Sequence, residues 1–137
     1  MYFQKGPAGA PPEVIAAALD TPMNPVVTRA FMLTIVASEG PPAFPGLPGH
    51  APNVAKARRD RAHVGRAMAE LRRVAPEGGA YVAESSYFQT DWQRAYWGSN
   101  YPRLRDIKSR YDPEGLFFVR HGVGSENWSE DGFDRIG

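Results

Sequence analysis

The short sequence from Tyr81 to Glu84 carries the side chains best suited to acid–base chemistry in this chain. Tyr81 supplies a phenol, and Glu84 supplies a carboxylate that could act as a general base if it is buried. In an extended strand Tyr81 and Ala83 would share one face, while Val82 and Glu84 would share the other. The alternative is structural: Tyr81 would then be a core aromatic, and Glu84 a carboxylate that faces solvent.

A second candidate is the glycine-rich sequence from His121 to Glu126. Gly122 and Gly124 would let the backbone approach a ligand closely. The sequence is not a phosphate-binding loop, because the spacing, the lysine and the following helix are all wrong for one. Ser125 lies four residues after His121, but no third catalytic group is evident, so the pattern does not favour a hydrolase. A structural turn is the favoured interpretation.

Metal and thiol chemistry are not expected. The three histidines do not have the spacing of metal ligands, and the chain has no cysteine for a disulfide, a thiolate site or a cysteinyl-flavin bond. Residues 53–75 are basic, which most simply indicates a solvated helix face, because the chain's net charge is only +1 and no stacking aromatics are interleaved. A docking face for an acidic partner is the alternative.

The composition is that of an ordinary globular domain. The chain has 137 residues, of which 42% are hydrophobic and 23% charged, and this length suits one domain with its own core. The near-zero net charge provides no field that would draw the protein to nucleic acid or to a membrane. No apolar run approaches the roughly 18 residues of a membrane span. The first residues lack the apolar stretch of a signal peptide, so we expect a cytoplasmic protein.

Four helices should position the candidate residues. Proline and acidic residues predict a helix over 13–19, and apolar spacing predicts a long one over 53–75. Thr90 and Gln93 match a capping box for a short helix that runs to Trp97, and Pro113 should end a helix over 101–111. The aromatics of this region are interpreted as core because of their helical spacing. They are Trp92, Tyr96, Trp97 and Tyr101.

Strands are expected over residues 26–37, 80–85 and 116–120, which are rich in β-branched and aromatic residues. Proline and glycine concentrate in residues 6–12 and 40–52, which are interpreted as loops. The fold class predicted is therefore α+β, with a small antiparallel sheet covered by helices on one face.

The order of motifs from Tyr81 to Gly124 resembles the C-terminal segment of the berberine bridge enzyme-like flavoprotein oxidases, within the vanillyl-alcohol oxidase superfamily. The resemblance rests on motifs whose order, spacing and aromatic identities coincide. They are Tyr81-Val82-Ala83-Glu84, the Trp/Tyr-rich helix, Gly98-Ser99-Asn100-Tyr101, Tyr111-Asp112-Pro113 and Gly122-Val123-Gly124-Ser125-Glu126. The resemblance extends over nearly the whole chain, more loosely before Asn53, but covers only about the last quarter of such an enzyme.

The resemblance implies that residues 1–121 form part of a substrate domain and that residues 122–137 are a tail returning toward a flavin domain. It implies FAD as the cofactor, with Ala83, Gly122 and Gly124 near it. Tyr81 matches the family's tyrosine and would orient or deprotonate the substrate. Ala83 stands where the family has asparagine, so an amide that could bond the flavin ring is lost.

The implied activity is oxidation of an alcohol or amine by hydride transfer to flavin, with the flavin domain supplied from outside this chain. Two alternatives stay open: a flavin-free cyclase, isomerase or dehydratase that uses Tyr81 and Glu84, and a binding module without catalysis. The implied partners are a small-molecule substrate and either a second copy or a flavin-domain chain, because a sheet without its upstream strands would leave an edge bare.

Overall fold

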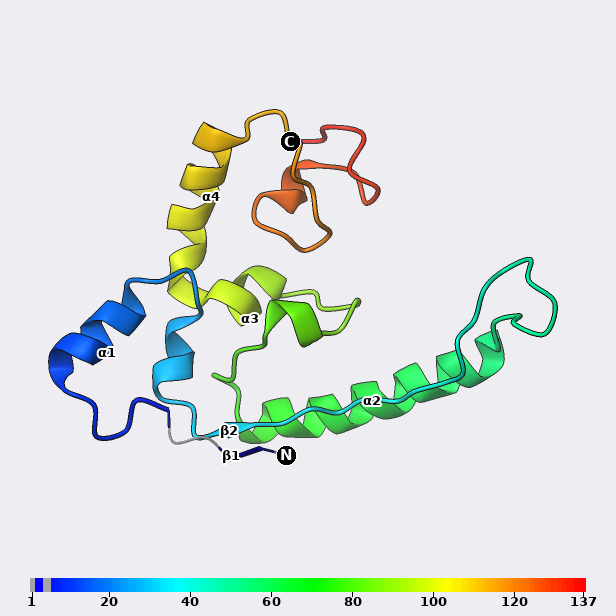
Figure 1. Cartoon of the computed structure of the whole chain (residues 1–137), viewed down its shortest axis with the longest axis horizontal. Helices are drawn as coiled ribbons and strands as arrows, with labels where there is room; N and C mark the ends of the chain where they lie inside the picture. Colours follow the sequence, from blue (N-terminus) through cyan, green and yellow to red (C-terminus); the bar gives the residue numbers. More distant parts are fainter. Residues whose placement is uncertain (1, 4–5) are drawn as a thin grey trace. The chain divides into compact units, whose positions relative to one another are not determined.

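Figure 1 shows the computed structural model of the chain, which describes residues 2–3 and 6–137. Helices dominate its regular structure. The elements are β1 (Tyr2–Phe3), α1 (Pro12–Leu19), the 3₁₀ turn η1 (Pro25–Thr28), β2 (Met32–Leu33), α2 (Val54–Val74), η2 (Val82–Glu84), α3 (Trp92–Trp97), η3 (Gly98–Asn100), α4 (Tyr101–Tyr111) and η4 (Ser125–Asn127). None of the helices in the described residues is both long and apolar enough to cross a membrane.

The α+β prediction, with its small antiparallel sheet, is wrong. Among the described residues the paired strands are only β1 and β2, two residues each, with Tyr2 opposite Leu33 and Phe3 opposite Met32. Residues 25–28 and 82–84 are 3₁₀ turns, and residues 116–120 form no strand.

The backbone hydrogen bonds explain this difference, because a strand exists only where another strand takes up its donors and acceptors. The Asn24 side chain accepts a hydrogen bond from the Val26 N–H and so begins η1 where the β-rich sequence predicted a strand. The Asp112 carboxylate likewise accepts from the N–H groups of Leu116 and Phe117. Local acceptors therefore override β-propensity at both places.

The helix predictions are confirmed, with boundaries one residue or less from those expected for α1, α2 and α4. Asn53 caps α2 by accepting from the Lys56 N–H at 2.9 Å. The capping box before α3 is wrong: the N-cap is Asp91, not Thr90, and its side chain makes no capping bond there. Its carboxylate instead accepts hydrogen bonds from the side chains of Gln89 and Arg94.

The described residues divide into two compact units. The first comprises residues 2–3 and 32–77, and it contains the β1–β2 pair and α2. None of the residues of α2 is fully buried, and the half-buried ones include Val64, Met68 and Leu71. Lys56 donates to the Glu39 carbonyl at 2.9 Å and so ties the segment after β2 to this helix.

The second unit comprises residues 6–31 and 78–137, and its core is the predicted aromatic cluster. Trp92, Tyr96 and Tyr101 are buried, and Trp97 packs against them. The Trp92 ring meets the Tyr101 ring edge to face, with centroids 5.4 Å apart. The interpretation of these aromatics as core is therefore confirmed, and this cluster positions the segments on either side of it.

Two asparagines attach the N-terminal part of this unit to the cluster. The Asn24 amide donates to the Ala95 carbonyl at 2.9 Å, and the Asn100 amide donates to the carbonyls of Thr21 and Met23. Gly98 has φ +53°, and a Cβ there would lie 2.7 Å from the Asn24 Oδ1. The turn between α3 and α4 is thus shaped to receive the segment that contains Asn24.

Candidate functional site

The Tyr81–Glu84 segment is a turn that is anchored at both ends on the aromatic core. Ahead of it, the Ala80 N–H donates to the Ala95 carbonyl at 2.8 Å. Behind it, the Ser85 hydroxyl donates to the Tyr96 hydroxyl oxygen at 2.6 Å. The Glu84 N–H donates to the Tyr81 carbonyl at 3.1 Å, which closes η2. The strand alternation expected for this segment is therefore absent, and Glu84 lies one turn after Tyr81 rather than on an opposite strand face.

The side chains of this turn face outward. Tyr81 is 60% exposed, and Val82, Ala83 and Glu84 are exposed as well. The burial on which a general-base role for Glu84 depends is not provided by the described residues. Tyr81 is exposed, so the structural alternative, in which Tyr81 is a core aromatic, does not hold for the described residues.

The two glycines proposed to approach a cofactor have structural reasons within the chain. A Cβ on Gly122 would lie 2.7 Å from the Val119 carbonyl oxygen. Gly124 is buried with φ +80°, and its N–H donates to the Tyr101 hydroxyl oxygen at 3.2 Å. Close packing thus accounts for glycine at 122, and the left-handed backbone accounts for it at 124.

A hydrogen-bonded pair that sequence reasoning missed joins α4 to η4. The buried Tyr101 hydroxyl donates to the Glu126 carboxylate while it accepts from Gly124. Burial raises the pKa of the Tyr101 phenol well above its ordinary value, and the adjacent Glu126 carboxylate raises it further. Because 25 residues separate the two partners, no local sequence pattern indicates the pair.

His121 lies beside the same cluster. Its ring stacks on the Trp92 ring, with centroids 5.8 Å apart and 18° between the planes. Burial lowers the pKa of the His121 imidazole, and the positive charge of Arg120 lowers it further, so both effects favour the neutral ring. The backbone at His121 has φ +58°, which is uncommon for a residue other than glycine.

The Tyr111-Asp112-Pro113 motif forms a closed loop after α4. Asp112 forms an ion pair with Lys108 and also accepts from the N–H groups of Leu116 and Phe117. The Lys108 ammonium lowers the pKa of the Asp112 carboxyl, which the two backbone donors lower further. Gly115 has φ +67°, and a Cβ there would overlap the Trp128 ring. The aspartate thus fixes the backbone that follows the helix.

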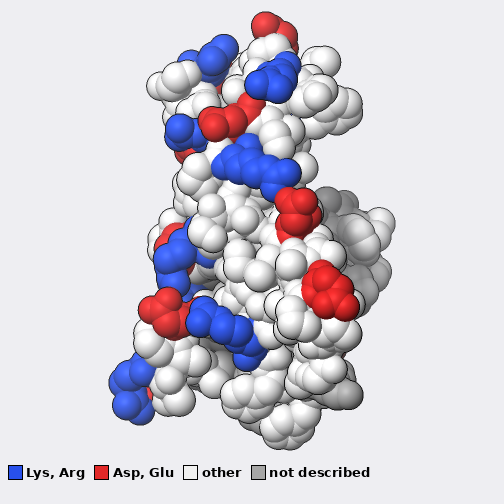
Figure 2. Space-filling model, turned by 90° about the vertical axis from the view of Figure 1, so that its left-hand side faces the viewer, with Lys and Arg blue, Asp and Glu red and all other residues white. Residues whose placement is uncertain are grey.

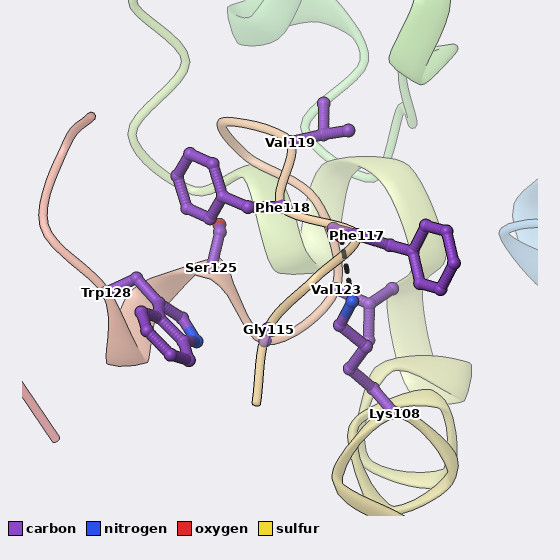
Figure 3. A pocket seen from close by; sticks show the side chains of 9 residues that line it. Lys108, Gly115, Phe117, Phe118, Val119, Val123, Ser125 and Trp128 are labelled. Carbon is purple, nitrogen blue, oxygen red and sulfur yellow. Dashed lines mark hydrogen bonds between the residues drawn. The ribbon is translucent and has the colours of Figure 1, made fainter. Parts of the chain in front are cut away.

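A shallow pocket lies next to this loop (Figure 3). It is lined by Lys108, Gly115, Phe117, Phe118, Val119, Val123, Gly124, Ser125 and Trp128. Its volume is about 180 Å³, including the part open to solvent. Pockets that bind small molecules are usually about 300–1,000 Å³. FAD does not fit this pocket, and the exposed residues 81–84 do not form an enclosure for the flavin by themselves.

Charges on the visible face of the molecule are mixed. In Figure 2 the Lys and Arg side chains alternate with those of Asp and Glu, and neither sign dominates this face. Among the ion pairs of the described residues is that between Arg103 and Asp20, at 3.0 Å. The face in Figure 2 does not provide the single-sign field that attracts a polyanion.

The part of the chain that matches known proteins lies in the second unit, which includes residues 78–137. The family described as "Berberine and berberine like" matches residues 80–124. The chain is 55% identical to the FAD-linked oxidoreductase notD' of Aspergillus versicolor over 62 residues, which are 45% of this chain and 10% of that protein. No solved structure matches the chain significantly.

Other relatives carry similar names. The chain is 48% identical to the FAD-linked oxidoreductase ZEB1 of Gibberella zeae over 67 residues, 47% of this chain and 12% of that protein. It is 39% identical to the VAO-type flavoprotein oxidase VAO615 of Thermothelomyces thermophilus over 61 residues, 44% of this chain and 11% of that protein. The chain thus spans about a tenth of the length of the curated relatives it matches.

Proposed function

We propose that this chain, which carries a berberine-like segment of FAD-linked oxidoreductases, supplies the substrate-side portion of such an enzyme. The reaction would be oxidation of an alcohol or amine by hydride transfer to flavin. The flavin would be held by a part of the enzyme outside the berberine-like segment. The 55% identity to a protein named as an FAD-linked oxidoreductase supports the class of enzyme.

The observation that carries this proposal is the outward-facing turn at Tyr81–Glu84. Ala80, just ahead of the turn, is bonded to Ala95, and Ser85, just after it, is bonded to Tyr96, so the turn is fixed on a packed core. Its side chains nevertheless contact solvent, and Tyr81 is 60% exposed. A fixed backbone with uncovered polar side chains suits one wall of a site whose other wall belongs to a second body.

In this proposal Tyr81 orients or deprotonates the substrate, and Glu84 is the candidate base. Both roles require the second body to exclude water from the turn, because an exposed carboxylate is a weak base. A partner is therefore part of the proposal. The bare sheet edge was the reason to expect either a second copy or a flavin-domain chain, and the described residues pair only β1 with β2. The exposed turn is therefore what supports a flavin-carrying partner in this proposal.

The first test is the visible absorption of the purified chain with added FAD. We expect no flavin bands to co-elute with the chain alone. Bands should appear when the chain is combined with notD' lacking the 62 residues that match this chain. Turnover of that complex should fall with Tyr81→Phe and with Glu84→Gln.

Matched controls are available in the same unit. Tyr111 is 78% exposed and Glu114 is exposed, so Tyr111→Phe and Glu114→Gln make the same chemical changes at other surface positions. Unchanged turnover in the Tyr81 and Glu84 variants would refute their roles. Absence of bound flavin in the complex of wild-type chains would refute the proposed function itself.

A further inference from the structure

Three apolar side chains that follow the Asp112 loop are largely exposed, and we call them the apolar strip. Leu116 is 82% exposed, Phe117 80% and Val119 65%. All three belong to the segment that matches the berberine-like family. Single exposed apolar residues are ordinary, but here three lie within four positions, and exposed apolar patches usually mark interaction sites.

The backbone beneath the apolar strip is held in place. The Asp112 carboxylate accepts from the N–H groups of Leu116 and Phe117 at 2.8 and 3.1 Å. The Phe117 carbonyl accepts from the Lys108 ammonium at 2.8 Å, and the Val119 carbonyl accepts from the Gly122 N–H at 2.7 Å. The strip is therefore presented by a fixed backbone.

The opposite side of the same backbone is already occupied. Figure 3 shows Phe117 and Phe118 pointing in opposite directions, with Phe118 on the side of Trp128. A Cβ on Gly132 would overlap the Phe118 ring, so Phe118 is packed closely against the C-terminal segment. Phe118 thus packs against the C-terminal segment, while Phe117 points away from it.

The chemistry of the strip selects its occupant. Residues 115–119 carry no charge and stand between Glu114 and Arg120. Arg120 forms an ion pair with Glu130, and Lys108 forms one with Asp112. The surface that complements the apolar strip is therefore itself apolar and uncharged. The chain spans only 10–12% of relatives such as notD' and ZEB1, so about nine tenths of such an oxidoreductase lies outside the matched segment and can supply that surface.

We propose that Leu116, Phe117 and Val119 are the docking surface for an apolar face of the flavin-carrying part of an FAD-linked oxidoreductase. This inference rests on the proposed function and adds to it the side chains that hold the two parts together. Docking costs little conformational entropy at this surface, because hydrogen bonds already order its backbone.

The test measures binding of the full-length chain to notD' lacking the 62 matched residues, together with flavin retention by the complex. Phe117→Ser and the double variant Leu116→Ser/Phe117→Ser remove apolar side chains that are 80% or more exposed. Loss of one buried Phe side chain should weaken binding roughly 10- to 100-fold. Far-ultraviolet circular dichroism should show that both variants keep the helix content of the wild type.

Phe133→Ser is the matched control, because Phe133 is 85% exposed and lies outside the berberine-like segment. Selective weakening by the strip variants supports the docking surface. Equal binding by wild type and strip variants overturns it and leaves the proposed function standing. An equal loss in Phe133→Ser also overturns it, since general hydrophobicity would then explain binding. No complex and no flavin with the wild type refute the proposed function itself, and the docking surface with it.

Discussion

Tyr101→Phe is the most informative substitution in the aromatic core, because it removes one hydroxyl that serves two partners. The hydroxyl donates to Glu126 and accepts from the buried Gly124 N–H at 3.2 Å. The phenylalanine ring keeps the packing against Trp92, whose ring centroid is 5.4 Å away. The change therefore tests the hydrogen bonds with little effect on the packing.

The expected loss of stability follows from those two bonds. A buried N–H left without an acceptor costs about 1–3 kcal/mol, and loss of a donor to a carboxylate adds to this. Because Glu126 is only half-buried, water can replace part of the hydrogen bond that its carboxylate loses. We expect the free energy of unfolding to fall by about 2–3 kcal/mol, which corresponds to a melting temperature lower by about 10 °C in a chain of this size.

The pH dependence provides a second, specific readout. The folded state raises the pKa of Tyr101 above its ordinary value of 10.0, because the phenol is buried beside a carboxylate. The stability from this group is complete below pH 10 and is lost as pH rises, because the unfolded phenol then ionises while the folded one stays neutral. Since Phe cannot ionise, the stability difference between wild type and Tyr101→Phe should shrink above pH 10.

The assay is urea unfolding followed by tryptophan fluorescence, because Trp92, Trp97 and Trp128 all lie in the second unit. Tyr111→Phe is the control, since Tyr111 is 78% exposed and its hydroxyl makes no hydrogen bond to the described residues. Equal stability of wild type and Tyr101→Phe at pH 7 would refute the energetic argument. A stability difference that stays constant from pH 8 to 11 would refute the assigned pKa shift.

Three further substitutions test how the loops of this unit are held. Gly115→Ala should destabilise the chain by about 2–4 kcal/mol in urea unfolding, because φ is +67° and the new Cβ would overlap Trp128; a near-neutral result would contradict that packing. The folded state lowers the pKa of Asp112, so the wild type loses the stability contributed by this carboxylate as pH falls below the ordinary 3.8. In Asp112→Asn the free energy of unfolding should therefore decrease less on acidification than in the wild type. Gly98→Ala should raise amide exchange in residues 21–26, because its Cβ would lie 2.7 Å from the Asn24 Oδ1; unchanged exchange there would show that the asparagine does not hold this segment.

The helices could be predicted from the sequence because their signals are local. Asn53 caps α2, and Pro113 excludes the helix from Asp112, so α4 ends at Tyr111 as expected. The strands could not be predicted in the same way, since β-propensity describes a side chain that fits a sheet and does not supply the neighbouring strand. Asn24 before Pro25 is the one local signal that could have indicated a 3₁₀ turn instead.

The candidate site was predicted only in part. The sequence located the Tyr81–Glu84 segment, whose catalytic and cofactor roles stay predictions, but it assigned the wrong local geometry. Glycine at 122 is explained by the Val119 carbonyl three residues earlier, and glycine at 124 by its φ of +80°. The partner of the Gly124 N–H is Tyr101, 23 residues away, and a single sequence does not show such a tertiary contact.

The Tyr81–Glu84 turn and the apolar strip share a property that distinguishes a docking surface from a loose loop. A loose loop combines exposed side chains with backbone groups that bond to water, and ordering it on binding costs conformational entropy. Here the backbone is bonded internally, through Ala95 at the turn and through Asp112 at the strip, while the side chains are left uncovered. Folding has therefore already met most of the entropic cost of docking. The free energy of burying the apolar strip could then hold the second body over Tyr81 and exclude water from Glu84. Exclusion of water is the condition that the proposed role of Glu84 requires.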